Sequence, residues 1–245
     1  MFGPFAKLAS PQIVEIAGFA GFDFMIFDTE HGPLSFESIE NLVRAAELSG
    51  VAPIVRTYEN SPALISRALD IGAQGVVVPH ITSRAEAEEL ARASRFFPHG
   101  ERGVCRFVRA AGFTSVDRFE YMRRASDEAL IIGIIESKDG LANLDEILSV
   151  EGLDVVFIGP YDLSQSLGLP GQVRHEQVLS SMQAVVEQAR RRGRSVGTFV
   201  DNVADAKYWA DAGVQFISFS VDVGIVYEAM KASVDQLKAA CLPQG

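Results

Sequence analysis

The chain has 245 residues, of which 48% are apolar, so it suits one large domain with a sizeable core. Its formal net charge of -10 gives an acidic surface that repels phosphate backbones and excludes nucleic acid as an expected partner. It has only two cysteines and no apolar run of the roughly 20 residues that a bilayer span needs, so we expect a cytoplasmic protein without membrane contact.

Short β-branched or aromatic runs alternate with longer amphipathic segments along the whole chain, a pattern typical of repeated βα units and a parallel sheet. Eight such units predict a closed (β/α)8 TIM barrel in a single domain over residues 1–245. An open doubly wound sheet would usually show fewer units or a glycine-rich phosphate turn after the first strand. The expected strands, in chain order, are "FAKLA" from Phe5, "FDFMIFD" from Phe22, "APIVR" from Ala52, "GVVVP" from Gly75, "LIIGIIE" from Leu130, "DVVFIG" from Asp154, "SVGTFV" from Ser195 and "FISFS" from Phe216.

The helix candidates between these strands carry recognisable start and stop signals. In "SFESIENLVRAAELSG", Ser35 can cap the free amides at the start and Gly50 can end the helix. Ser61 followed by Pro62, and Ser83, begin the next two helices in the same way. The basic run "RRRGR" at 190–194 falls at the end of a predicted helix, where cations favour the negative end of the helix dipole.

The segment 96–127 breaks this rhythm between the fourth helix and the fifth strand. It is too long for a simple connector, and long segments in compact domains are usually functional or held by a neighbour. We therefore expect it to reach over a site or into an adjacent subunit.

Charged residues gather at the expected carboxyl ends of the strands, where barrels of this type place their active sites. The second strand ends at Asp28 with His31 just beyond it, the third ends at Arg56, the fifth at Glu136, and the sixth leads to Asp162. A buried ion is costly unless it is paired or holds a metal, so these strand ends predict a binding site.

Two of these carboxylates, Glu136 and Asp162, follow very apolar runs on adjacent strands. They could supply two oxygen ligands to Mg²⁺ or Mn²⁺, with water and an oxygen-rich substrate completing the shell. The structural alternatives are that Glu136 pairs with an arginine and that Asp162 caps the turn "DLSQSLG".

The "FDTEHGPLS" stretch places His31 three residues after Asp28. Asp28 can orient the imidazole and raise its basicity, which predicts a general base or acid near neutral pH. Glu30 has no comparable local partner and is expected to point outward. Arg56 can meet an anionic ligand, or it can form an ion pair with Asp28 or Glu136.

Several motifs together resemble the HpcH/HpaI family of class II, metal-dependent pyruvate aldolases. They are "FDFMIFDTEHGPLS", "APIVR", "IGAQGVVVPHITSRAEAE", "FFPHGERG", "GIIES" and "DVVFIGPYDLSQSLG". Their order along almost the whole chain, at expected strand ends, makes the resemblance more specific than any single motif.

The resemblance implies a barrel of the phosphoenolpyruvate/pyruvate type that binds Mg²⁺, Mn²⁺ or Co²⁺. It further implies reversible cleavage of a 4-hydroxy-2-oxo acid to pyruvate and an aldehyde through a metal-bound pyruvate enolate. Glu136 and Asp162 match the family's metal-binding carboxylates, Arg56 matches the arginine at the keto oxygen, and His31 with Asp28 matches its base dyad.

The run "GPYDLS" is the expected substrate-binding turn, formed by Gly159, Pro160 and Tyr161. Glycine allows close approach, and amides at a helix start can bind the substrate carboxylate. Four positions depart from the family pattern: Ile134 stands where some members have glutamine, Tyr161 replaces a small residue, His80 replaces an apolar residue, and Phe97 stands where proline is frequent. These changes leave open whether the aldehyde carries an apolar tail or a second carboxylate recruited by an arginine of segment 96–127.

The resemblance also implies a homo-oligomer, a hexamer built as a trimer of dimers that exchange a C-terminal helix. The segment "VDVGIVYEAMKASVDQLKAACL" carries a wide apolar stripe that fits this role, or fits packing on its own barrel. The alternatives to aldolase activity are an acyl-coenzyme A lyase of the citrate-lyase-beta type and a non-catalytic barrel that binds a keto acid.

Overall fold

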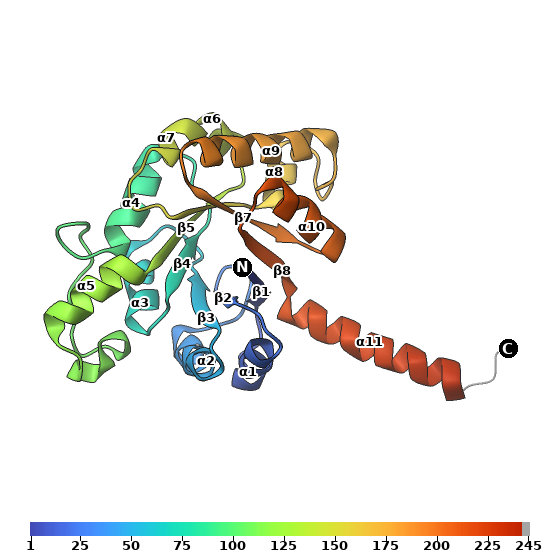
Figure 1. The fold of residues 1–245 in the computed structure, drawn as a ribbon, viewed down its shortest axis with the longest axis horizontal. Helices are drawn as coiled ribbons and strands as arrows, with labels where there is room; N and C mark the ends of the chain where they lie inside the picture. Colours follow the sequence, from blue (N-terminus) through green and yellow to red (C-terminus); the bar gives the residue numbers. More distant parts are fainter. Residues whose placement is uncertain (242–245) are drawn as a thin grey trace.

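Eight parallel strands close into a barrel in the computed structural model, which describes residues 1–241 (Figure 1). Each strand pairs with its neighbours in chain order, and β8 pairs with β1 to close the ring. The predicted TIM barrel is therefore confirmed; residues 242–245 of the predicted domain lie outside the described part. The strands are β1 Phe2–Ala6, β2 Phe24–Asp28, β3 Ala52–Arg56, β4 Gly75–Val78, β5 Leu130–Ile135, β6 Val155–Ile158, β7 Ser195–Val200 and β8 Phe216–Val221.

The strand positions follow the sequence pattern closely, and β3 and β7 have the expected bounds. The main difference is β1, which begins at Phe2 rather than Phe5. Phe2 and Gly3 pair with Ile217 and Ser218 of β8. This pairing joins opposite ends of the chain, so the local sequence pattern does not reveal it.

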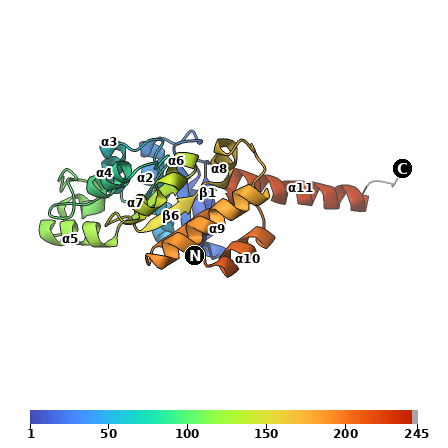
Figure 2. The ribbon, with the colours of Figure 1, turned by 90° about the horizontal axis from the view of Figure 1, so that it is seen from above.

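Helices follow the strands around the outside of the barrel (Figures 1 and 2). Ser35 caps α2 by accepting a hydrogen bond from the Ser38 amide at 3.2 Å, and Gly50 ends that helix in the left-handed conformation. Ser83 forms a full capping box, whereas Ser61 makes no side-chain cap bond. The helices are α1 Pro11–Phe19, α2 Phe36–Ser49, α3 Pro62–Asp70, α4 Arg84–Ser94, the 3₁₀ helix η1 Arg109–Thr114, α5 Arg118–Glu128, α6 Lys138–Ala142, α7 Leu144–Leu148, α8 Pro160–Ser166, α9 Glu176–Arg191, α10 Val203–Ala212 and α11 Asp222–Cys241.

The barrel has two separate clusters of buried apolar side chains. One fills the barrel interior, and the other lies between the strands and the surrounding helices. The interior cluster takes alternate residues of each strand, because successive side chains of a strand point to opposite faces. On β2 these residues are Phe24 and Ile26, and on β5 they are Ile132 and Ile134. The next inward positions toward the carboxyl ends are therefore Asp28 and Glu136.

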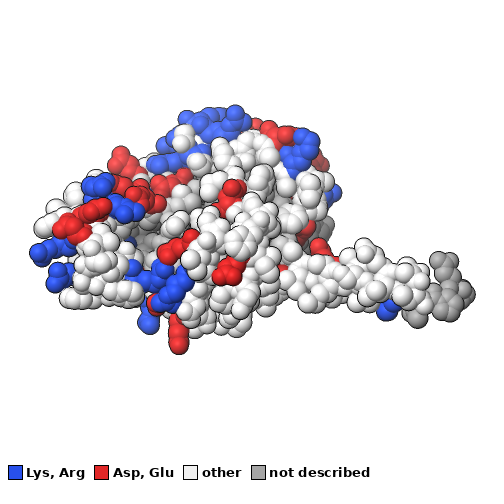
Figure 3. Space-filling view, turned by 60° about the horizontal axis from the view of Figure 1, so that its bottom comes forward, with Lys and Arg blue, Asp and Glu red and all other residues white. Residues whose placement is uncertain are grey.

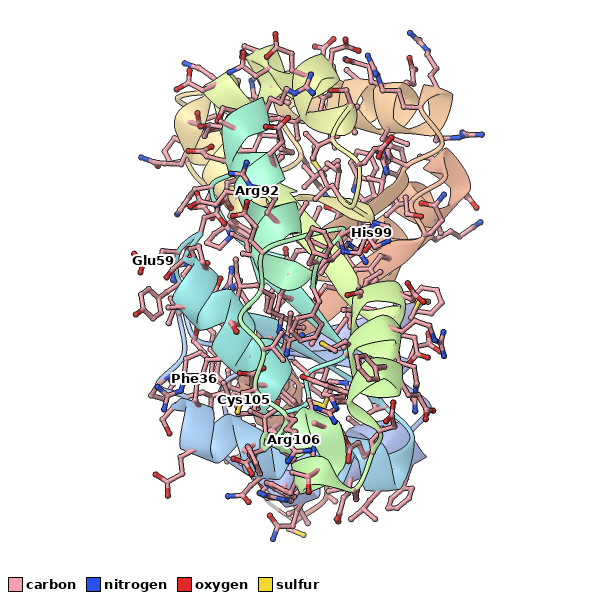
Figure 4. The ribbon with its side chains drawn as sticks, turned by 90° about the vertical axis from the view of Figure 1, so that its left-hand side faces the viewer. Phe36, Glu59, Arg92, His99, Cys105 and Arg106 are labelled. Atoms are coloured by element: carbon pink, nitrogen blue, oxygen red, sulfur yellow. The ribbon has the colours of Figure 1, made fainter. Side chains whose placement is uncertain are left out.

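The segment 96–127 does not lie over the carboxyl ends of the strands. Its Arg102 pairs with Asp70 of α3 at 2.6 Å, and its Arg109 pairs with Glu47 of α2 at 2.5 Å. The segment includes η1 and nearly all of α5, and it borders a cavity of about 770 Å³ beside Gln74, which immediately precedes β4. Figure 4 shows part of the segment on the face formed by α3, α4 and α5.

Within its own chain the segment therefore does not reach the carboxyl-end cavity, and its reach into an adjacent subunit stays a prediction. It follows α4, which returns the chain to the amino-terminal ends of the strands, opposite the expected site.

The last helix, α11, projects away from the barrel (Figures 1 and 2). Its start is anchored because buried Asp222 accepts hydrogen bonds from the backbone amides of Lys7 and Leu8, both at 3.0 Å. Beyond this anchor most apolar side chains of α11 are exposed, although Ile225 and Val226 are half-buried, and Figure 3 shows a projection with few charges. Packing on its own barrel, one of the two expected arrangements, is therefore not observed. None of the helices within residues 1–241 combines the length and apolarity that a membrane crossing requires.

Candidate active site

Asp28 and Arg56 form a buried ion pair at the carboxyl ends of β2 and β3. They are direct register partners, so their inward-pointing side chains meet. Arg56 donates from Nε to Asp28 Oδ1 at 2.9 Å and from Nη2 to Oδ2 at 2.8 Å. The ion pair with Asp28 that the sequence left open for Arg56 is therefore present.

The surroundings of Asp28 favour its ionised form. Burial alone would raise the pKa of this carboxyl group, but the hydrogen bonds and charge of Arg56 outweigh that effect. The backbone amides of Glu30 and His31 also donate to Oδ1, at 3.0 and 3.2 Å. The net pKa is lowered, so Asp28 carries a fixed negative charge at neutral pH.

The Glu30 side chain points toward the Asp28–Arg56 ion pair, so the expectation that it points outward is wrong. Its side chain is 13% exposed, and Oε2 lies 2.9 Å from Nη1 of Arg56. The strand-exit turn folds back over Asp28 through the amides of Glu30 and His31, and this brings the Glu30 carboxylate beside the guanidinium. Arg56 is therefore flanked by two carboxylates.

His31 lies at the mouth of this group with 55% of its side chain exposed. The expected contact between its imidazole and Asp28 is not formed, because Arg56 occupies both carboxylate oxygens. Among residues 1–241, the carboxylate in ion-pair range of the His31 ring is that of Glu30, with Nε2 and Oε1 3.9 Å apart. Asp28 instead positions His31 through its backbone amide.

Glu136 follows β5 directly and is 5% exposed. Its Oε1 accepts the backbone amide of His80 at 2.8 Å, and the His80 ring nitrogen Nδ1 also lies 2.8 Å away. The pKa of Glu136 is raised to about 7, mostly by burial; the charges of Asp162 and Glu30 add to the shift, and His80 opposes it. The predicted alternative of an arginine partner is wrong within the described residues, since the ion-pair partner is His80.

Gly159 follows β6 and lies against Glu136. A Cβ atom at Gly159 would stand 2.7 Å from Oε2 of Glu136, so any side chain there would displace the carboxylate. Helix α8 begins at Pro160, with Gly159 as its N-cap, and Asp162 lies in its first turn. The alternative reading of Asp162 as the capping residue is therefore wrong.

Tyr161 closes one side of the same region. Its hydroxyl donates to Oδ2 of Asp201 at 2.7 Å, and its ring packs edge-on to Phe199 with a centroid distance of 6.1 Å. The pKa of Tyr161 is raised to about 12, mostly by burial and also by the bond to Asp201 and the charge of that carboxylate. Tyr161 is therefore a neutral hydrogen-bond donor.

All eight predicted site residues line one cavity of about 370 Å³. They are Asp28, His31, Arg56, Glu136, Gly159, Pro160, Tyr161 and Asp162. The structure thus brings them together, and their individual roles stay predictions.

Sequence reasoning did not assign four other residues to this region. Lys7 Nζ lies 3.8 Å from Oδ2 of Asp28, and Lys7 and Asp201 both line the cavity. Glu30 contacts Arg56, and His80 contacts Glu136. Lys7, His80 and Asp201 directly follow or lie within two residues of β1, β4 and β7. Asp28 was selected because it is a charged residue at the carboxyl end of a strand. The same criterion would have selected Lys7, His80 and Asp201.

The chemistry of Glu136 and Asp162 fits a hard divalent cation. Glu136 is a buried carboxylate without an arginine or lysine partner among the described ion pairs, and nearby negative charge makes its ionised form costly. A cation would relieve that cost with oxygen ligands of the preferred kind. No cluster of three or more potential ligand side chains occurs within residues 1–241, so water and substrate would complete the shell.

Comparisons with known proteins agree with this architecture. The chain is 33% identical to a hydroxypyruvate/pyruvate aldolase of Delftia acidovorans over 98% of its own length and 88% of the relative. It is 33% identical to a 5-keto-4-deoxy-D-glucarate aldolase of Escherichia coli, covering 96% and 91% of the two chains. A solved HpcH/HpaI aldolase/citrate lyase family protein from Burkholderia cenocepacia superposes with a TM-score of 0.92 at 32% identity, covering 97% and 94%.

The sequence profile described as HpcH/HpaI aldolase/citrate lyase matches residues 1–229, which contain all eight strands and the first part of α11. With the relatives matched over almost their full length, this chain belongs to the HpcH/HpaI aldolase/citrate lyase family.

Proposed function

We propose that this chain is a metal-dependent pyruvate aldolase that reversibly cleaves a 4-hydroxy-2-oxo acid into pyruvate and an aldehyde. The observation that carries the proposal is the convergence of an acid pair, Glu136 and Asp162, with Arg56 and His31 on one cavity. The aldolase names of the curated relatives confirm the expected class of carbon–carbon lyase.

Glu136 and Asp162 are the residues that would hold the divalent ion, which we expect to be Mg²⁺, Mn²⁺ or Co²⁺. When bound, the ion supplies a Lewis acid for the oxygens of a 2-oxo acid. A lysine that forms a Schiff base is not needed, and Lys7 instead lies in ion-pair range of Asp28.

Arg56 would stabilise the negative charge that develops on the keto oxygen during cleavage. A guanidinium has five N–H groups. Asp28 accepts from Nε and Nη2, and Glu30 lies beside Nη1, so three N–H groups at most are engaged and donors remain for a ligand in the cavity. The guanidinium also lies over the ring of Phe5, 4.6 Å from its centroid. These contacts hold it in place before substrate binds, so little reorganisation is needed.

His31 would act as the base, directly or through a water molecule. It removes the proton from the 4-hydroxyl group, a carbonyl forms at C4, and the C3–C4 bond breaks with its electron pair staying on C3. Protonation of C3 then completes pyruvate. Asp28 supports this step by holding the backbone of His31, while the exposed ring keeps access to the cavity.

Gly159, Pro160 and Tyr161 would form the substrate-binding turn. Gly159 has no side chain, which leaves room for the Glu136 carboxylate. For the same reason it does not cap the backbone amides at the start of α8. Those amides can receive the substrate carboxylate. Tyr161 and Phe199 would contact the aldehyde portion.

The alternatives predict different behaviour toward pyruvate. An acyl-coenzyme A lyase or a non-catalytic keto-acid-binding barrel has no need to enolise it. We expect the wild-type protein with added Mg²⁺ or Mn²⁺ to exchange the pyruvate methyl protons with deuterium, measured by proton NMR. Absence of exchange in folded, metal-supplemented protein would contradict the proposal.

We further propose that the protein is a cytoplasmic homo-oligomer, a hexamer built as a trimer of dimers whose subunits exchange α11. The exposed apolar residues of α11 support exchange, because a stripe of this kind needs a partner surface. They are Val223, Tyr227, Met230, Val234 and Leu237.

A further inference from the structure

His80 lies two residues after β4 in an uncommon backbone conformation. Its φ angle is +58°, in the left-handed region that residues with side chains seldom occupy. The next residue, Ile81, donates its backbone amide to the carbonyl of Ile134 in β5 at 3.0 Å. The turn is therefore tied to the strand that carries Glu136.

This conformation directs two nitrogen atoms of His80 to a single oxygen of Glu136. The backbone amide and the ring Nδ1 both lie 2.8 Å from Oε1. A carboxylate oxygen can accept both, and Nδ1 must carry its proton to donate. The other oxygen, Oε2, lies over Gly159, which lines the cavity.

We propose that His80 is a positioning residue for the metal carboxylate: its two donors hold Oε1 of Glu136 and leave Oε2 to bind the ion. The inference rests on the proposed function, in which Glu136 is a metal ligand. Polar partners of this kind fix the orientation of a ligand side chain and commonly change metal affinity when removed.

A second carboxylate lies near the other edge of the His80 ring. Nε2 lies 3.5 Å from Oε1 of Glu30, whose Oε2 is 2.9 Å from Nη1 of Arg56. The ring is 63% exposed, and its contact of hydrogen-bond length is the one between Nδ1 and Glu136. His80 thus links the metal carboxylate to the group around Arg56.

The left-handed backbone allows the role of the ring to be separated from that of the turn. In His80→Gly the backbone keeps its conformation and its amide donor but loses the imidazole. In His80→Asn the side-chain amide can donate from a similar position, and asparagine tolerates the left-handed region. His99→Ala is the matched control, because His99 is exposed on segment 96–127, away from the cavity.

The test is Mn²⁺ binding to the metal-stripped full-length protein, followed by the electron paramagnetic resonance signal of free Mn²⁺. We expect His80→Gly to weaken binding by about tenfold to 100-fold, His80→Asn to restore most of the loss, and His99→Ala to bind as the wild type does. Circular dichroism checks that each variant is folded.

The Glu136→Gln variant distinguishes failure of this inference from failure of the proposed function. If Glu136→Gln loses Mn²⁺ while His80→Gly binds it normally, the positioning role is overturned and the metal-ligand role stands. If His80→Asn binds no better than His80→Gly, the donor role is likewise wrong. If Glu136→Gln binds Mn²⁺ normally, both the inference and the proposed metal site fail.

Discussion

Arg56 and Asp28 form a two-bond ion pair across adjacent strands, with Nε to Oδ1 at 2.9 Å and Nη2 to Oδ2 at 2.8 Å. The pair stands directly above the apolar barrel interior, where Ile26 and Ile54 are the preceding inward residues. It therefore separates the packed core from the cavity and presents a fixed cation to that cavity.

Replacing Asp28 should destabilise the fold strongly. In Asp28→Asn the buried Arg56 keeps Glu30 but loses the carboxylate that accepts two of its hydrogen bonds. Removing one partner of such a buried pair costs about 3 kcal/mol or more. Urea unfolding measures this loss. The matched control is Asp127→Asn in the exposed pair with Arg123, where we expect a change below about 1 kcal/mol. Equal losses in both variants would contradict the buried role of Asp28.

The same carboxylate predicts a pH dependence of stability. Because the pKa of Asp28 is lower in the folded state, its contribution is present above the unfolded-state pKa of about 3.9 and is lost as the pH falls through the folded-state pKa. The free-energy difference between wild type and Asp28→Asn should be constant from about pH 5 to 7 and shrink below about pH 4. A difference that grows on acidification would be inconsistent with a lowered pKa.

A methyl group at Gly159 should disturb Glu136. The added Cβ would stand 2.7 Å from Oε2, so the carboxylate must move. We expect Gly159→Ala to weaken Mn²⁺ binding about tenfold and to raise KM for the substrate. Gly103→Ala is the control, since a Cβ there meets nothing within 4 Å. Unchanged metal affinity in Gly159→Ala would show that the close approach to Glu136 is not required.

Charges on the exposed stripe of α11 should disrupt assembly. Met230 and Val234 lie one turn apart and are 65% and 45% exposed. The Met230→Asp/Val234→Asp double variant should sediment as a smaller species than the wild type. Gln236→Asp adds a charge at an already polar position of the same helix and should assemble normally. An unaltered sedimentation profile for the double variant would count against α11 exchange.

The barrel and most of the cavity could be predicted because period-two alternation determines which strand residues face inward. Asp28 and Glu136 continue the inward rows of Phe24 and Ile26, and of Ile132 and Ile134. Their positions therefore follow from the strand pattern alone.

Residues in the turns beyond the strands were harder to place. Glu30 folds inward because the amide groups of its turn bind Asp28, and His80 reaches Glu136 through a left-handed φ angle. Neither backbone conformation can be read from side-chain periodicity. The course of segment 96–127 and the projection of α11 also depend on contacts between distant parts of the chain, so local patterns did not reveal them.

The central claim is tested most directly by pyruvate release from 4-hydroxy-2-oxo acids, followed with a lactate dehydrogenase coupled assay. The account predicts that metal-stripped protein is inactive, that Mg²⁺, Mn²⁺ or Co²⁺ restores release, and that Glu136→Gln abolishes it. Folded, metal-supplemented wild type that releases no pyruvate from substrates with either apolar or carboxylated tails would contradict it.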